Sequence, residues 1–381
     1  MRYRWVVLFA GTLASAGYAA VPLGLSAIAP ELASHYHLSL QQIGVLFGAS
    51  ALGQVVLLLP WGFAADRWGE QLVIGVGLTL TAAALVVATL PRSFVPLVAV
   101  LAAVAGFGAS AASGSGRAVM QWFARNERGL ALGIRQSAIP LGGAAGALAL
   151  PPIAAAGGVD AAYLALAGTC LACAVVAVIL LRREPAHQDE LHELGRPLHD
   201  PRIWILCLGS AFVLVGQIAV MNFVVLFLHD ARGVGTSRAA GVLAGVQLLG
   251  GVLRVAGGRW TDRHGRRVPL FRRLALLLAL ALGGAAALES ASLWLLIPVL
   301  LVAGGLGMSW NGLSFTAAAE IAGRARAGAA VGFQQTVLAV GSAITPIVFA
   351  IAAAASWRVA FAGAAVCPLV GVLLLRPLAD L

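Results

Sequence analysis

The ten residues GFAADRWGEQ at positions 62–71 return as GRWTDRHGRR at positions 258–267. Both copies keep Gly in the first place, Asp-Arg in the fifth and sixth, and Gly in the eighth. Each copy separates two long apolar stretches, so the repeated unit includes the segments around it. A polar loop that returns between apolar segments indicates a chain built from two similar halves.

Other positions repeat in the same order at an offset of 196 to 199 residues. The pairs are Trp5 with Trp204, Gly17 with Gly216, Gly106 with Gly304, Gly114 with Gly312, Gly129 with Gly328, Gly133 with Gly332, Gln136 with Gln335, and Gly142 with Gly341. Ordered matches along a whole half are hard to obtain by chance, and they strengthen the prediction of two tandem repeats.

The composition predicts an integral membrane protein. Of the 381 residues, 60% are hydrophobic and only 10% are charged, and the mean hydropathy is +0.93. Soluble globular proteins carry roughly 25% charged residues. The net charge of +10 would suggest nucleic acid in a soluble protein, but here the charges lie between apolar stretches, so we expect a lipid bilayer as the partner and no nucleic acid.

Twelve apolar stretches are long enough to cross a membrane as helices, which predicts an all-α fold. They cover residues 5–29, 40–64, 71–90, 94–123, 129–154, 159–181, 203–228, 238–260, 269–288, 292–319, 327–353 and 357–376. One long polar segment, residues 182–202, divides the chain into six helices and six helices. We therefore expect an N-terminal bundle at 1–181, a linker at 182–202 and a C-terminal bundle at 203–381.

The basic residues predict the orientation in the membrane. The chain contains no lysine, and roughly 18 of its 25 basic residues fall on one side if the N-terminus is cytoplasmic. Examples are Arg2, Arg4, Arg182, Arg183, Arg266, Arg267, Arg272 and Arg273. The positive-inside rule then predicts cytoplasmic N- and C-termini in a bacterial cell membrane.

The loops G-x-x-x-D-R-x-G-x-x after the second helix and G-x-x-x-D-R-x-G-R-R after the eighth resemble the signature loop of the major facilitator superfamily. The resemblance extends to the six-plus-six count and the central linker. It implies a secondary transporter with two six-helix bundles, a solute site between them near the membrane midplane, and alternating access. It also implies that the loops form a cytoplasmic latch.

The residues of this gating latch are the Gly, Asp and Arg that the two loops share. They are Gly62, Asp66, Arg67, Gly258, Asp262 and Arg263. We expect the two glycines to allow a close crossing of helices, because small residues let membrane helices approach. We expect the aspartates to pair with the neighbouring arginines or with helix N-terminal amides.

Three arginines lie inside predicted helices: Arg117, Arg135 and Arg254. A charge within a membrane helix costs a few kcal/mol, so it normally faces a cavity or a partner. Arg135 lies about 9 Å above Gly129 and Arg254 about 12 Å above Asp262, in the cytoplasmic half of the membrane. The opposing interpretation is that these arginines reach the cytoplasmic interface or line a gate without touching solute.

No Asp or Glu lies deep in a predicted helix, so an anionic solute is the natural partner of the arginines. Arg254, four residues before Gly258, resembles the helix 8 arginine of monocarboxylate and oxalate transporters. The pattern R-x-x-x-x-W-F from Arg117 resembles organic-anion symporters. Those symporters carry Asp-Arg after a tyrosine of helix 1, however, whereas Tyr18 here is followed by Ala-Ala-Val.

Polar residues at matching places in the two halves complete the predicted solute site. With the three arginines, the candidates are Gln136, Gln335, Asn311, Trp310, Tyr18, Gln54 and Gln247. Such side chains also form hydrogen bonds between membrane helices, and that alternative stays open for each of them.

The leading hypothesis is a transporter of a small organic anion, working by symport, antiport or facilitated movement. The alternative is an exporter of hydrophobic or cationic drugs, although the tract Ile139–Gly143 departs from the exporter pattern G-P-x-x-G-G. A membrane enzyme is a third class, but the chain lacks H-E-x-x-H, P-loop and G-x-S-x-G motifs. We expect a monomer that is not an enzyme and has no cofactor or metal.

Overall fold

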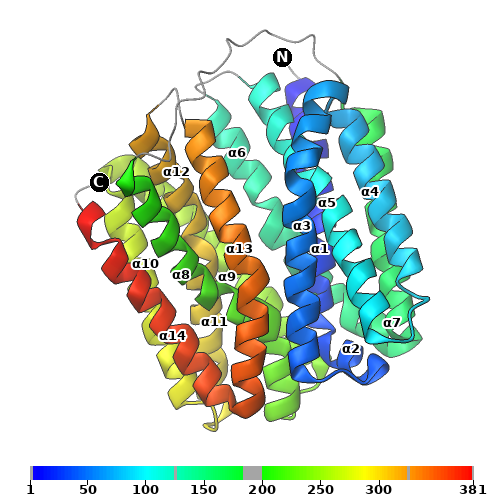
Figure 1. The fold of residues 1–381 in the computed structure, drawn as a ribbon, viewed down its shortest axis with the longest axis vertical. Coiled ribbons are helices and arrows are strands. Elements are labelled where there is room, and N and C mark those ends of the chain that lie inside the picture. The colour runs from blue at the N-terminus through cyan, green and yellow to red at the C-terminus, as the bar shows by residue number, and fades with distance from the viewer. Residues whose placement is uncertain (1–2, 124–126, 183–199, 324–326, 380–381) are drawn as a thin grey trace. The chain divides into compact units, whose positions relative to one another are not determined.

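The computed structural model describes residues 3–123, 127–182, 200–323 and 327–379, and every element within these ranges is helical (Figure 1). The elements are α1 (Tyr3–Ala27), α2 (Ala29–Tyr36), α3 (Leu40–Trp68), α4 (Glu70–Val87), α5 (Phe94–Trp122), α6 (Arg128–Gln136), α7 (Ala138–Leu180), α8 (Pro201–Leu226), η2 (Phe227–Ala231), α9 (Thr236–His264), α10 (Arg267–Ala287), α11 (Leu293–Ser309), α12 (Asn311–Ala322), α13 (Ala327–Ala355), α14 (Trp357–Leu374) and η3 (Arg376–Leu378). Within the described ranges, 11 helices are long and apolar enough to cross a membrane, which confirms the predicted all-α membrane fold.

The longest element, α7, contains most of the predicted span 129–154 and nearly all of the predicted span 159–181. Gly158 inside it has φ 76° and ψ −177°, a backbone conformation that glycine adopts easily and a helix does not contain. A straight helix of 43 residues would run for about 65 Å, roughly twice the thickness of the apolar layer. Counted as two spans that meet at Gly158, α7 agrees with the predicted helices at 129–154 and 159–181.

Two predicted spans are interrupted where the sequence predicts a continuous helix. The first contains Ser137, which separates α6 from α7 and whose N–H donates to the carbonyl oxygens of both Gly133 and Ile134. The second contains Trp310, which separates α11 from α12 and is fully buried. Neither serine nor tryptophan is a strong helix breaker, so local propensity does not reveal these positions.

The chain folds into two compact units. The first comprises Met1–His187 with Leu228–Ala244, and the second Gln188–Phe227 with Gly245–Leu381. The sequence analysis assigns residues 228–244 to the C-terminal bundle, whereas this division groups them with the first unit.

In the first unit, small residues bring helix backbones into contact. α1 packs on α7 and α5, and α3 packs on α5. A Cβ atom at Gly53 of α3 would overlap the carbonyl oxygen of Ala102, and one at Gly142 of α7 would overlap that of Ala16. Both glycines therefore permit the close approach that stabilises helix pairs in lipid.

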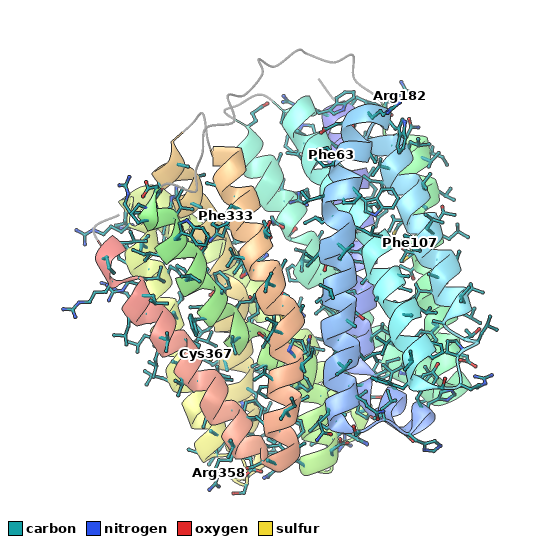
Figure 2. All side chains as sticks on the ribbon, viewed as in Figure 1. Phe63, Phe107, Arg182, Phe333, Arg358 and Cys367 are labelled. Atoms are coloured by element: carbon teal, nitrogen blue, oxygen red, sulfur yellow. The ribbon has the colours of Figure 1, made fainter. Side chains whose placement is uncertain are left out.

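In the second unit, α8 packs against α11, α13 and α14, and α10 packs against α11 and α14. Phe333 of α13, labelled in Figure 2, meets the ring of Trp204 edge to face, with ring centroids 4.7 Å apart. Farther along α8, Phe223 lies 4.8 Å from Phe349 between ring centroids. Aromatic pairs thus fix α8 to α13 at two levels of the unit.

Candidate functional site

Arg135 ends a chain of polar groups inside the first unit. Its Nη1 donates to the hydroxyl of Ser115 on α5 at 3.2 Å, and Ser115 shares a hydrogen bond of 2.9 Å with Ser15 on α1. Ser115 is fully buried. The buried Nε of Arg135 makes no hydrogen bond to any described residue. Three helices are thus joined by a polar chain that carries a positive charge at one end.

The second unit contains the same arrangement without the charge. Gln334 of α13 donates through Nε2 to the hydroxyls of Ser314 on α12 and Ser210 on α8. The two serine oxygens are 2.6 Å apart, and all three residues are buried. We call the sets Ser15, Ser115, Arg135 and Ser210, Ser314, Gln334 the first and second polar triads.

The two triads follow the internal repeat. An offset of 199 residues pairs Arg135 with Gln334 and Ser115 with Ser314. The sequence analysis selected the next pair along, Gln136 and Gln335, but Gln335 is exposed and Gln136 is half-buried. Gln334 was therefore missed, although the same offset together with the two serines contained the signal.

Arg254 of α9 holds the end of α11. Its Nε and Nη2 both donate to the carbonyl oxygen of Met308, at 3.1 and 2.8 Å. α11 ends at Ser309, and the last carbonyls of a helix have no partner inside that helix. They also carry the partial negative charge of the helix dipole, which favours a nearby cation. Arg254 thus bridges two helices through a main-chain acceptor.

Gln217 of α8 is a buried polar residue that the sequence analysis did not select. Its Nε2 lies 3.4 Å from the sulfur of Met308 and 3.5 Å from that of Met221. Thioether sulfur is a weak acceptor. Its Oε1 is buried without a hydrogen bond among the described residues. Buried amides are normally satisfied, so the Oε1 of Gln217 requires an explanation.

Three of the predicted site residues of the second unit also have buried polar atoms that bond to no described group. They are Gln247 at both ends of its amide, Trp310 at Nε1 and Asn311 at Oδ1. Trp310 stacks on Phe271 with ring centroids 5.2 Å apart and an interplanar angle of 13°. Gln247 is fully buried on α9, two helical turns before Arg254.

The predicted site residues of the first unit behave differently. The hydroxyl of Tyr18 donates to the carbonyl oxygen of Ala105 at 3.0 Å, and the ring lies against Gly108, where a Cβ atom would overlap it. Tyr18 is thus packed between α1 and α5 with its polar group satisfied. Gln54 of α3 is half-buried.

The signature loops end their helices as predicted, but one expectation is wrong. Arg67 lies in the last turn of α3 and Arg263 in the last turn of α9, and both are exposed, as is Asp66. A Cβ atom at Gly62 or Gly258 would meet no described atom within 4 Å, so neither glycine serves a close helix crossing in the structure. The gating role of the loops stays a prediction.

The second signature loop also contains Arg267, whose Nε pairs with Glu320 of α12 at 2.7 Å. Its Nη1 donates to Thr261 at 3.3 Å. The residue at the matching place in the first loop is Gln71, whose Nε2 donates to the carbonyl oxygen of Val178. The loops are therefore tied to different neighbours in the two units.

Two predicted residues lie partly outside the described structure. The backbones of Arg117 and Asp262 are helical, but their side chains are not among those described. Several acidic residues within the described ranges lie at helix ends, as predicted: Glu31 in the first turn of α2, Asp230 in η2 and Glu320 near the end of α12, whereas Asp160 lies inside α7, two residues after the kink at Gly158. Over those ranges, no three His, Cys, Asp or Glu side chains are grouped to hold a metal ion.

Apolar spans that carry guanidinium and amide groups define a multi-pass membrane protein. The Major Facilitator Superfamily model matches residues 7–346, and the chain belongs to this family. It is therefore a membrane transporter of small-molecule solutes and not an enzyme, as the sequence analysis predicted.

Curated relatives agree with the family. The chain is 31% identical over 375 residues to an uncharacterised MFS-type transporter of Mycobacterium tuberculosis, covering 97% of this chain and 84% of the relative. It is 26% identical to a probable sulfoacetate transporter of Cupriavidus necator, and the match covers 86% of this chain and 82% of the relative. It is 29% identical to a hexuronate transporter of Bacillus subtilis over 121 residues, and the match covers 32% of this chain and 28% of the relative.

Solved structures share the fold. A bacterial homologue of the human lysosomal transporter Spinster matches with a TM-score of 0.81 and 18% identity, covering 100% of this chain and 96% of that one. A D-xylose-proton symporter also matches with a TM-score of 0.81 and 16% identity. This match covers 98% of this chain and 97% of that one. These likenesses confirm the predicted transporter fold.

Proposed function

We propose that this transporter moves a small organic anion across the bacterial cell membrane by alternating access, as a monomer with both termini in the cytoplasm. The observation that carries the proposal is the environment of Arg254. Arg254 belongs to the membrane-spanning helix α9. Among the described residues, its guanidinium bonds only to the carbonyl oxygen of Met308.

A main-chain carbonyl satisfies the hydrogen bonds of a guanidinium but does not neutralise its charge. A carboxylate or sulfonate does both, through charge-assisted bonds that are stronger than bonds to a neutral acceptor. Within the described residues Arg254 has no carboxylate partner, and neither does Arg135. Two cations inside apolar spans, neither with a carboxylate partner among the described residues, favour an anionic cargo.

The names of two relatives support the same substrate class. One is a probable sulfoacetate transporter and the other a hexuronate transporter. Sulfoacetate carries a sulfonate and a carboxylate, and a hexuronate carries a carboxylate, so both are organic anions.

The alternative is export of hydrophobic or cationic drugs. Inside a membrane, the charges of Arg135 and Arg254 would repel a cationic cargo, because few ions screen charges there. The acidic residues of the described spans lie at span ends, with Glu70 at the start of α4 and Asp160 just after the kink at Gly158, which makes this alternative the weaker one.

Transport by the purified protein in liposomes tests the proposal. We expect uptake of radiolabelled sulfoacetate or glucuronate above that of empty liposomes, and competition between the labelled compound and other small carboxylates. Liposomes with the protein in the same amount but preincubated at a denaturing temperature provide the control. If the protein transports a cationic dye and neither takes up nor binds sulfoacetate, glucuronate or the other small carboxylates, the proposal of an anionic substrate is wrong and the drug-export alternative is favoured.

A further inference from the structure

The unsatisfied amide of Gln217 belongs to a small group of side chains that meet at one residue. Met308 accepts the guanidinium of Arg254 at its carbonyl oxygen and the amide of Gln217 at its sulfur. Both side chains therefore reach the same point on α11, one from α9 and the other from α8. We call Gln217, Arg254 and Met308 the Met308 cluster.

The two contacts differ in strength and in the freedom of their acceptors. The carbonyl oxygen of Met308 belongs to the helical backbone of α11, which α9 approaches closely, since a Cβ atom at Gly250 would overlap the Cβ of Met308. Its side chain is unbranched and flexible, and its sulfur accepts hydrogen bonds only weakly. The amide of Gln217 is thus held by a group that a better acceptor can displace at little cost.

The internal repeat indicates that the fold does not require this arrangement. An offset of 199 residues pairs Gln217 with Tyr18, and Gly307 with Gly108. In each unit the larger residue lies against the glycine. In the first unit the polar group is satisfied, because the hydroxyl of Tyr18 donates to a main-chain carbonyl. In the second, Oε1 of Gln217, which is 8% exposed, lacks a donor among the described groups.

The chemistry of the unsatisfied atom restricts the ligand. A carboxylate or sulfonate offers acceptors only, so it suits the guanidinium of Arg254 and the Nε2 of Gln217. It cannot satisfy Oε1, which needs a hydrogen-bond donor. A hydroxyl group donates and accepts, so it can bond to either end of the amide.

We propose that the Met308 cluster is a subsite for a hydroxylated organic anion, in which Arg254 binds the anionic group and Gln217 forms a hydrogen bond with the hydroxyl group. The side chain of Met308 holds the amide until the ligand displaces it. This inference rests on the proposed function, since it assumes an anionic substrate. It goes beyond it by naming a second functional group of the substrate and the residue that selects it.

Matched pairs of anions test the inference on the purified transporter. Glycerate is compared with propionate, and isethionate with ethanesulfonate, because the members of each pair share the anionic group and differ in hydroxyl groups. Binding is measured by titration calorimetry. We expect the parent protein to bind the hydroxylated member about fivefold more tightly or better, as one or two net hydrogen bonds would give.

Gln217→Leu should remove this preference by weakening the hydroxylated member alone. Gln217→Met, which suits the two neighbouring thioethers, serves as a second variant if the leucine protein does not fold. Gln334→Leu is the matched control, because it makes the same change at a buried glutamine that lies outside the Met308 cluster and whose Nε2 bonds to two serines. Its ratio of affinities should equal that of the parent.

The outcomes separate the inference from the proposed function. If the parent binds the anions, Arg254→Gln weakens both members of a pair, and Gln217→Leu leaves their ratio unchanged, the inference is wrong and the anion proposal stands. Equal affinity of the parent for both members also overturns the inference. If the parent binds none of the four anions, nor sulfoacetate or glucuronate, the proposed function itself fails.

Discussion

Arg135 and Gln334 stand 199 residues apart and make the same contact, each donating a side-chain hydrogen bond to the serine at the matching place in its own unit. For Arg135 the serine is Ser115, and for Gln334 it is Ser314. The two triads differ in one charge and in one bond, because Gln334 also donates to Ser210 whereas, among the described residues, Arg135 donates to Ser115 alone. The repeat thus provides a natural reference for what a neutral residue does at the position of Arg135.

Replacing Arg135 with Gln should preserve stability, because the second triad contains glutamine at this place. We expect the midpoint of thermal unfolding to change by no more than about 4 °C. Arg135→Leu should unfold at a lower temperature, since it leaves the buried hydroxyls of Ser15 and Ser115 without a donor from α6. Equal unfolding temperatures for the Gln and Leu variants would show that the hydrogen bond to Ser115 contributes nothing.

Arg254→Gln should weaken the binding of the native anion by about ten- to a hundredfold, because a charged hydrogen bond of roughly 1.5 to 3 kcal/mol is lost. Lysine should restore binding only in part, since an ammonium group cannot reproduce the guanidinium fork that now grips Met308. Direct binding to the purified variants measures both effects.

The three intramembrane arginines should differ in importance. We expect Arg254→Gln to cost the most affinity, Arg117→Gln less and Arg135→Gln the least, because Arg135 lies nearest the end of its span that we propose to be cytoplasmic and already bonds to Ser115. If all three glutamine variants bind the anion as tightly as the parent, the arginines are structural and the anion proposal fails.

The arginine distribution predicts which loops face the cytoplasm. In a background without the four native cysteines, a cysteine at His192 in the linker should react with a membrane-impermeant maleimide only after the cells are permeabilised. A cysteine at Arg232, just after η2, should react in intact cells. Labelling of His192→Cys from outside would reverse the proposed orientation.

Asp262→Asn should alter conformational cycling more than affinity, if the second signature loop acts as a cytoplasmic latch. We expect slower turnover in liposomes and a dissociation constant close to that of the parent. Asp66→Asn, the matching change in the first loop, should act in the same direction. Parental turnover combined with strongly weakened binding would move these aspartates from the gate to the solute site.

Gly142 and Gly62 should respond in opposite ways to alanine. Alanine favours a helix over glycine by about 1 kcal/mol, so Gly62→Ala should leave stability unchanged or raise it, because a Cβ there meets no described atom within 4 Å. At Gly142 the same Cβ would overlap the carbonyl oxygen of Ala16, so Gly142→Ala should lower the unfolding temperature. A stabilised Gly142→Ala protein would contradict the packing of α1 on α7.

The sequence by itself determined the fold class, the number of spans and the family. An apolar stretch of about 20 residues has few alternatives to a membrane helix, and the repeated loops at residues 62–71 and 258–267 fixed the two-fold repeat. It also located Arg254 and Gln247, since a polar residue within an apolar stretch stands out without knowledge of its neighbours.

Only the tertiary structure decided which polar residues are satisfied. Tyr18 and Gln217 occupy matching positions and look like equal candidates in the sequence, yet one bonds to Ala105 and the other meets only thioethers. Gln334 and Gln335 are neighbours on α13. The rotation of the helix directs Gln334 toward the serines of the second polar triad and leaves Gln335 exposed. The reason is physical: hydrogen-bond partners come from other helices, and which face of a helix meets them depends on how all the helices pack.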